Sequence, residues 1–453
     1  MTTSTETETG ARIDAAGLSA MIAAAGLFTL GKPRKGSGLS DDPPRYCRVR
    51  VAAAGGVLGI EATDATDCRF TAVIAPRGGV PNFDAMIDAD AIASTCRGGG
   101  FDSAIVTGDR FTARGATIDA KPVADPWPIE VADPSAIAAR IVIDAGTVAR
   151  IAREVAVASD PSTSRYALGG IAFDVEPAAP GERYGRSHAI ATDGRRLHVL
   201  TIPRSACPVG DAPATAEVVI VPASVIVRAA KAIAGTIPRG VDPETVAVTI
   251  DASPTRSDGN RESVSIQWIA GDFTATITAK PVVGRFPRWR DVLTGEAARG
   301  ALIGDAGAGD PVSTWSGDAK AIVAACRDAI RGVCRPGKRG GNPSGVDFTA
   351  GDQVSGGADR FPRMSAKTAA GAFDRVLGAG APDNVGLASP GFAVKLNPDS
   401  VIDALAGFPR GELARLATDA ARVGEAAVFV RRGRGIDAEH VAGFTAVIMP
   451  LGK

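Results

Sequence analysis

Hydrophobic residues along the chain switch between a strand-like and a helix-like spacing. In the stretch 217–237, the β-branched run EVVIVP passes directly into ASVIVRAAKAIAGTI, whose apolar positions recur every three or four residues, as on an amphipathic helix. The stretches 246–251 and 262–270, VAVTID and ESVSIQWIA, then alternate apolar and polar residues, as strands with one buried face do. This pattern predicts one strand, one helix and two or three antiparallel strands.

The same order of elements recurs in the other parts of the chain. Helix-like segments occur at 19–30 and 147–158, SAMIAAAGLFTL and TVARIAREVAVA, and strand-like segments follow both of them. In the last third, FAVKLNPDSVIDALAGF and EAAVFVRRG have the same character. We therefore expect an α+β fold in which each third of the chain has two helices on one side of about eight antiparallel strands.

An internal repeat supports three copies of one domain. Residues 108–128 read GDRFTARGATIDAKPVADPWP and residues 271–287 read GDFTATITAKPVVGRFP, with a shorter echo at Phe444, Thr445 and Ala446. A chain of 453 residues is also long enough for about three domains. We predict domains over 1–136, with a short disordered start, over 137–299 and over 300–453, the last with an exposed Gly/Arg-rich loop at 331–345.

Charge and cysteine content limit the classes of partner. Fifty basic residues balance fifty acidic ones, so any basic surface for a nucleic acid must be local. The six cysteines are scattered without metal or redox spacing, which is typical of reduced, buried thiols in a cytoplasmic protein. The polar, acidic start and the absence of a long apolar run predict a soluble, cytoplasmic chain with no membrane partner.

The material for enzyme chemistry is sparse. His188, Asp193 and His198 flank an Asp-Gly turn, but Asp193 is several residues from either imidazole and no nucleophile stands beside them. We interpret this segment as a surface hairpin. The segment 337–341, GKRGG, lacks the ending and the preceding strand of a phosphate-binding loop and is interpreted as a mobile basic loop. We predict no catalysis, no cofactor and no metal.

Three segments carry a resemblance to a known family. They are ATDGRRL at 191–197, GRFPRWR at 284–290 and VIMPL at 447–451. In this order and spacing they resemble the Thr-Asp-Gly-His-Arg-Leu, Gly-Arg-Phe-Pro-aromatic and Met-Pro-Met-Arg-Leu segments of the beta subunit sliding clamp of bacterial DNA polymerase III. The resemblance is strongest over 140–295 and 390–453.

The resemblance implies a non-catalytic processivity factor. Three tandem clamp domains, each with two helices packed on antiparallel sheet, would close a ring as a head-to-tail homodimer around double-stranded DNA, without sequence preference. The replicative DNA polymerase, the clamp loader and repair proteins would bind through short linear peptides. A divergent paralogue or phage-type clamp that acts as a peptide-binding scaffold is an alternative, and a metal-free enzyme on an α+β fold is another.

The resemblance also implies two sets of site residues. The walls of a partner-peptide pocket would be Leu168, Thr192, Gly194, Arg196, Leu197, Pro287, Val292, Met449, Pro450 and Leu451. The DNA-contacting residues would be Lys32, Arg34, Lys35, Arg150, Arg153, Arg228, Lys231, Lys320, Arg327 and Arg331. The alternatives are ordinary core for Leu168, Leu197 and Val292, and solvated helix faces for the basic residues.

Three departures from the family pattern concern the pocket. Arg195 replaces the usual His of the first segment, Asp291 replaces the basic residue before the Val of the second, and the tail ends in Gly452 and Lys453. An acid in place of a basic wall residue is expected to weaken acidic ligands and favour basic ones.

Overall fold

The computed structural model of the chain consists of two compact units. The first unit comprises Met1–Ala149 and Ala206–Val283, and the second comprises Arg150–Ser205 and Gly284–Lys453. The structure describes residues 11–29, 49–54, 56–64, 67–74, 82–87, 104–107, 110–113, 116–119, 121–122, 137–160, 167–175, 187–202, 217–255, 261–292, 312–332, 345–353, 360–368, 371–377, 388, 392–408, 413–419, 427–431 and 444–449.

The first unit contains a large antiparallel sheet and a small one. The large sheet has the order β10 (Ala139–Asp144), β15 (Ala247–Ala252), β16 (Val264–Ala270), β17 (Phe273–Ala279), β4 (Cys68–Ile74), β3 (Val57–Thr63), β2 (Val49–Ala54), β5 (Phe83–Ile87) and β9 (Lys121–Pro122). The small sheet has the order β1 (Ala11–Ile13), β6 (Ala104–Thr107), β7 (Arg110–Ala113) and β8 (Ala116–Asp119). Strand β14 (Glu217–Pro222) leads directly into a helix, as the sequence predicts.

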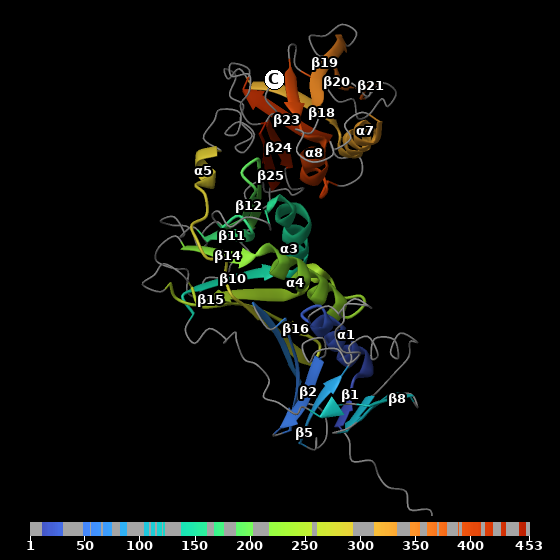
Figure 1. Ribbon diagram of the computed structural model, residues 1–453, viewed down its shortest axis with the longest axis vertical. Coiled ribbons are helices and arrows are strands. Elements are labelled where there is room, and N and C mark those ends of the chain that lie inside the picture. Colours follow the sequence, from blue (N-terminus) through green and yellow to red (C-terminus); the bar gives the residue numbers. More distant parts are fainter. Residues whose placement is uncertain are drawn as a thin grey trace, which may run out of the picture. The chain divides into compact units, whose positions relative to one another are not determined.

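Two helices cover the large sheet of the first unit. Helix α1 (Ala15–Gly26) packs on β2, β3 and β4, and α4 (Ala223–Thr236) lies beside it against β16 (Figure 1). The Asp14 carboxylate caps α1 by accepting hydrogen bonds from the backbone N–H groups of Ala16 and Gly17. Between helices and sheet, the Phe28 and Phe70 rings stack with centroids 5.5 Å apart, and the Trp268 ring lies 6.1 Å from that of Phe70.

The second unit repeats this construction. One sheet contains, in order, β11 (Gly170–Val175), β12 (Ser187–Thr192), β13 (Arg196–Ile202), β25 (Phe444–Ile448), β24 (Ala427–Arg431), β23 (Leu413–Asp419) and β18 (Val312–Asp318). The other has the order β21 (Gly371–Val376), β20 (Arg360–Thr368), β19 (Val346–Gln353) and β22 (Ala393–Leu396). Helix α7 (Ala319–Gly332) packs against α8 (Pro398–Ala404), and the short α5 (Trp289–Val292) stands apart from them (Figure 1).

The helix predicted at 147–158 is irregular. It begins as α3 (Ala145–Arg150), continues as a π-helical turn over Ile151–Val155 and ends as a 3₁₀ turn over Ala156–Ala158. A π-turn adds a residue to the helical repeat and so changes which side chains face the sheet. One consequence is that the charged Glu154 is fully buried.

Along the chain, the described elements form repeated runs of a strand, a helix and three strands. The runs with all five elements are β1-α1-β2-β3-β4, β10-α3-β11-β12-β13, β14-α4-β15-β16-β17, β18-α7-β19-β20-β21 and β22-α8-β23-β24-β25. A further run contains the strands β5, β6, β7 and β8, and residues 88–103, between its first two strands, lie outside the described residues. The α+β interpretation is confirmed, and the predicted element order recurs along the chain.

The last strands of different runs join the halves of each large sheet. Strand β17 pairs with β4, with Phe273 opposite Ile74, and β25 pairs with β13, with Phe444 opposite Leu200. The second and third copies of the Phe-Thr-Ala string therefore occupy equivalent places. These joints cross the predicted domain limits, while the limits themselves, 1–136, 137–299 and 300–453, stay a prediction.

The first copy of the string is offset by one strand. Phe111 lies on β7, whereas the strand equivalent to β17 by position in its run is β8. The Ala-Thr-Ile of β8, which precedes Lys121 and Pro122, matches the Ala-Thr-Ile of β17, which precedes Lys280 and Pro281. The alignment of the repeat on Phe-Thr-Ala was therefore wrong for this copy, and the Ala-Thr-Ile string gives the structural equivalence.

Candidate partner-binding and nucleic-acid surfaces

The segment 191–197 forms a tight turn between β12 and β13. Asp193 Oδ1 accepts hydrogen bonds from the backbone N–H groups of Arg195 (2.8 Å) and Arg196 (3.0 Å). The Thr192 hydroxyl donates to the Arg196 carbonyl (2.6 Å) and accepts from the Gly194 N–H (3.0 Å). Gly194 has φ +83°, a conformation that favours glycine. The side chains of Thr192 and Asp193 thus hold the backbone of this turn.

The Arg196 guanidinium is held by three acceptors. Its Nε donates to Asp193 Oδ2 (3.0 Å), its Nη1 to the Asp403 carboxylate on α8, and its Nη2 to the Val157 carbonyl (2.7 Å). The side chain is 15% exposed. Arg196 therefore ties the turn to α8 and to the 3₁₀ end of the irregular helix.

The C-terminal strand completes this end of the sheet. Strand β25 pairs with β13, with Ile448 opposite Arg196 and Val447 opposite Leu197, and the Met449 N–H donates to the Arg195 carbonyl (2.9 Å). Leu197 is buried and the Met449 side chain is about half exposed. The structure therefore brings Met449 beside the turn, as the predicted pocket requires.

One further predicted wall residue, Leu168, is accounted for near this end. Leu168 is buried in front of β11, and its carbonyl accepts a hydrogen bond from the Asp160 N–H (2.9 Å). Pro450 and Leu451 lie outside the described residues.

Pro287 and Val292 belong to a segment that is anchored at the other end of β12. The Asp174 carboxylate accepts hydrogen bonds from Trp289 Nε1 (2.9 Å) and Arg290 Nη1 (2.6 Å). Asp174 lies on β11 opposite His188, whose ring is 5.3 Å from that of Trp289. We predict that Pro287 and the exposed Val292 line the same cleft as the turn, and this stays a prediction.

The hairpin that includes His188 and His198 is confirmed, but its interpretation as a surface hairpin was wrong. Strands β12 and β13 pair from Ser187–Ile202 to Thr192–Leu197 in the interior of the sheet. His198 is fully buried, its Nδ1 lies 2.6 Å from the Glu154 carbonyl, and burial lowers the pKa of its imidazole from 6.5 to about 4. The imidazole is therefore neutral near pH 7.

A buried ion cluster next to His198 was not predicted from the sequence. The Glu154 carboxylate is within 3.3 Å of Arg150 Nη2 and 2.9 Å of Arg153 Nη2. Gly407, just after α8, leaves the space that this carboxylate occupies. In the sequence, Glu154 is visible only as one acid in the largely apolar segment 147–158.

The predicted DNA-contacting residues fall into two groups. Arg150 and Arg228 are largely occupied within the protein, Arg150 by Glu154 and Arg228 by Asp64 (3.2 Å) and by the Phe28 ring, 5.1 Å from its guanidinium carbon. The more exposed group is Arg153, Lys231, Lys320, Arg327 and Arg331. Lys32, Arg34 and Lys35 lie outside the described residues, as do positions 333–344 of the Gly/Arg-rich loop.

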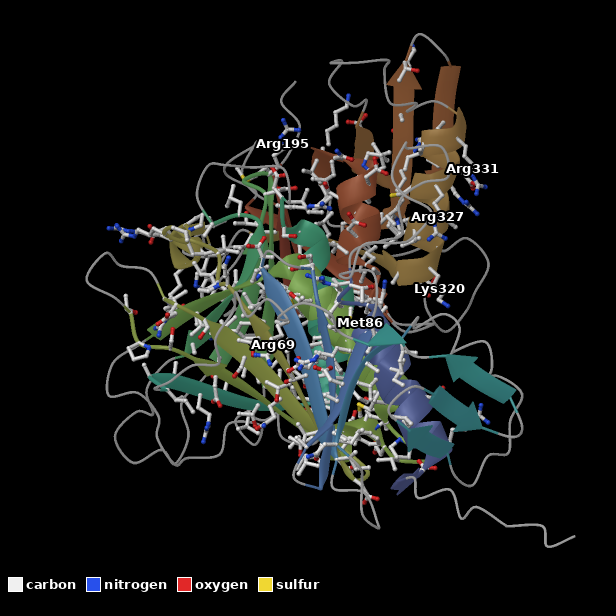
Figure 2. The ribbon with its side chains drawn as sticks, turned by 60° about the horizontal axis from the view of Figure 1, so that its bottom comes forward. Arg69, Met86, Arg195, Lys320, Arg327 and Arg331 are labelled. Carbon is white, nitrogen blue, oxygen red and sulfur yellow. The ribbon has the colours of Figure 1, made fainter. Side chains whose placement is uncertain are left out.

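Helix α7 carries the clearest basic row. Lys320, Arg327 and Arg331 are all exposed, and their spacing of seven and four residues places them on one side of the helix, as Figure 2 shows. Asp328 is paired with Arg375 (3.2 Å).

The described residues contain no group of three or more His, Cys, Asp or Glu side chains arranged to hold a metal ion. Within the same residues, no helix is long and apolar enough to span a membrane. Cys68 and Cys326, both in the described part of the chain, are buried.

The fold of the chain is similar to that of proteins with solved structures. Across 98% of its length the chain has the fold of the bacterial DNA polymerase III beta subunit, or sliding clamp. The beta subunit from Thermotoga maritima matches with TM-score 0.67 at 12% identity over 99% of its own chain.

Other solved clamps match equally well. The sliding clamp from Pseudomonas aeruginosa bound to griselimycin matches with TM-score 0.66 at 16% identity, over 98% of this chain and 100% of that one. The sliding clamp from Bacillus subtilis matches with TM-score 0.64 at 13% identity, over 98% of each chain. No family model matches the sequence, and no curated protein matches it. The similarity of this chain to the solved sliding clamps is therefore a similarity of fold.

Proposed function

We propose that the protein is a DNA sliding clamp that encircles duplex DNA and tethers the replicative polymerase and other replication and repair proteins, without catalysis of its own. The observation that carries the proposal is the likeness of fold to sliding clamps over 98% of the chain. The repeated runs support it, because three domains of two runs each account for the length of the chain.

The pairing of the strands supports a head-to-tail homodimer. In the two large sheets, the last strand of one run pairs with the last strand of an earlier run, as β17 with β4 and β25 with β13. In the small sheets of the described structure, the equivalent last strands are β8 and β21, and both stand at sheet edges. Edge strands of this kind are usually covered. Pairing of β8 with the β21 of a second copy would repeat the same joint and close a ring.

The basic row on α7 suits a ring that slides. Lysine and arginine side chains attract phosphates without reading the bases, and their contribution weakens as salt rises. A balanced total charge is compatible with this role when the basic groups are gathered locally. We assign Lys320, Arg327 and Arg331, together with the exposed Arg153 and Lys231, to the DNA-facing surface.

We assign partner peptides to a pocket formed by the turn at 192–197, Leu168, Met449 and the segment from Pro287 to Val292. An apolar cleft with a few polar groups is the usual site for a short linear peptide. Asp291 is exposed on α5 and is expected to favour a basic group at its position in the ligand. A titration in which Asp291→Arg leaves the preference between basic and acidic peptides unchanged would contradict that assignment.

The ring is tested by mass and by imaging. Native mass spectrometry should give a species of twice the 46.0 kDa chain mass, and negative-stain microscopy should give closed rings with an open centre. A monomer at micromolar concentration, or a compact dimer without a hole, would contradict the proposal. Loading by the cognate clamp loader onto primed circular DNA separates a replicative ring from a clamp-like scaffold, because the scaffold would bind partner peptides and fail to load.

A further inference from the structure

Two consecutive arginines at the turn between β12 and β13 differ in their burial and in their hydrogen-bond partners. Arg196 is largely buried and has an acceptor at each of its three guanidinium nitrogens. Arg195 is exposed, and its backbone is fixed from both sides, since its N–H donates to Asp193 and its carbonyl accepts from Met449. Figure 2 shows the Arg195 side chain extending away from the ribbon.

The negative charges around Arg196 outweigh its own positive charge. Asp193 and Asp403 are both within ion-pair distance of its guanidinium, so two carboxylates face one cation. The turn would therefore repel an acidic ligand if Arg195 were absent. Within the described residues, the Arg195 side chain has neither a hydrogen bond nor an ion pair, and its charge is available to a ligand.

We propose that the Arg195 guanidinium binds an acidic group of the partner peptide. Asp403 is a positioning residue, because its carboxylate holds the Arg196 side chain within the fold and neutralises the charge of Arg196. This inference rests on the proposed function, because it assigns the ligand chemistry of the same pocket. Arg195 and Met449 are joined backbone to backbone and both are exposed, so the cation belongs to the same end of the sheet as the apolar side chain that the peptide would cover. The ligand chemistry is a short apolar peptide with one carboxylate at the Arg195 position, separate from the basic group expected beside Asp291.

The position of Asp403 explains why the neighbouring arginines differ. Asp403 is contributed by α8, 207 residues away from Arg196 in the chain, and it engages Nη1 while Val157 engages Nη2. With these acceptors the Arg196 guanidinium points into the protein. Removal of the Asp403 charge would leave Arg196 with Asp193 alone, and the turn would gain one unit of positive charge.

The test uses the full chain and a displayed library of random heptapeptides. The best acidic peptide selected by the wild-type protein, and its counterpart with the acid replaced by the amide, are then titrated against each variant. Wild-type protein should prefer the acidic peptide by about two- to fivefold, the size expected of one exposed ion pair. Arg195→Gln should abolish the preference or reverse it toward the amide peptide, and 0.5 M salt should reduce the wild-type preference.

Two other variants complete the test. Asp403→Asn should raise the acidic-to-amide ratio, a result that a purely structural role for Asp403 would not give. Arg239→Gln, the same change at an exposed arginine after α4, should leave the ratio as in wild type. An unchanged ratio in Arg195→Gln, or a lower ratio in Asp403→Asn, would overturn the inference while the pocket stands. A library that yields no binding peptide would overturn the pocket and the inference together.

Discussion

The close approach of Gly407 to Glu154 gives a prediction with a calculable size. A Cβ added at Gly407 would lie within 2.5 Å of Glu154 Cγ and Oε1, and closer still to Cδ. Glu154 has no room to retreat, because it is fully buried and is held by Arg150 and Arg153. In Gly407→Ala, either the segment after α8 or the carboxylate must move.

The expected loss in the free energy of unfolding is about 3 kcal/mol. Overpacking of a buried site costs ~1–3 kcal/mol, and complete loss of a buried ion pair costs ~3–5 kcal/mol, of which we expect a part. Because 1 kcal/mol shifts the melting temperature of a unit of this size by roughly 2–4 °C, Gly407→Ala should melt roughly 6–12 °C lower by calorimetry. Trp289 and Trp315 report on the same unit by fluorescence.

Two controls separate the close contact from a general effect of alanine. At Gly235, in α4, an added Cβ meets nothing within 4 Å, so Gly235→Ala should be neutral or stabilising by roughly 0.5–1 kcal/mol. In a Glu154→Ala background the contact is gone, and Gly407→Ala should then cost less than about 1 kcal/mol. A loss below about 1 kcal/mol for Gly407→Ala in the wild-type background would refute the packing argument.

Three further predictions concern titration, reactivity and DNA. The buried His198 stays neutral down to about pH 4 while the unfolded chain takes up a proton below about pH 6.5, so stability should fall as pH drops through that window. His198→Gln should lose this part of the pH dependence in urea-unfolding midpoints, and a wild-type midpoint that is flat over the window would contradict it. Burial raises the pKa of Cys68 to about 12, so iodoacetamide at pH 8 should leave Cys68 unlabelled in the native protein and label it in urea; native labelling in peptide mass spectra would contradict this. Replacement of Lys320, Arg327 and Arg331 by Gln should reduce the slope of log affinity for duplex against log salt by about 3 for each chain of the ring, and an unchanged slope would remove α7 from the DNA surface.

The element order could be predicted because each run carries its own local pattern. The β-branched stretch before Pro222 and the helical spacing after it are both visible within 20 or so residues, and they correspond to β14 and α4. The turn at Asp193 and Gly194 could likewise be predicted, because an Asp-Gly pair between alternating stretches is a strong hairpin signal.

What could not be predicted depends on distant partners. The pairing of Arg196 with Asp403 spans 207 residues, and no local pattern indicates which of two adjacent arginines will be enclosed. The burial of Glu154 depends on a π-turn, and regular helical periodicity does not include one. The place of His198 inside the sheet follows from the pairing of β13 with β25, which joins segments from different thirds of the chain.

We propose that the protein holds DNA by encircling it, and retention on closed and open DNA tests this most directly. The protein is loaded onto a nicked circular duplex, washed in 0.5 M salt to remove electrostatic binding, and measured again after the circle is cut once by a restriction enzyme. A ring should stay on the intact circle for many minutes and leave within seconds of linearisation. Equal retention on circular and linear DNA, or complete loss from both in high salt, would contradict the account.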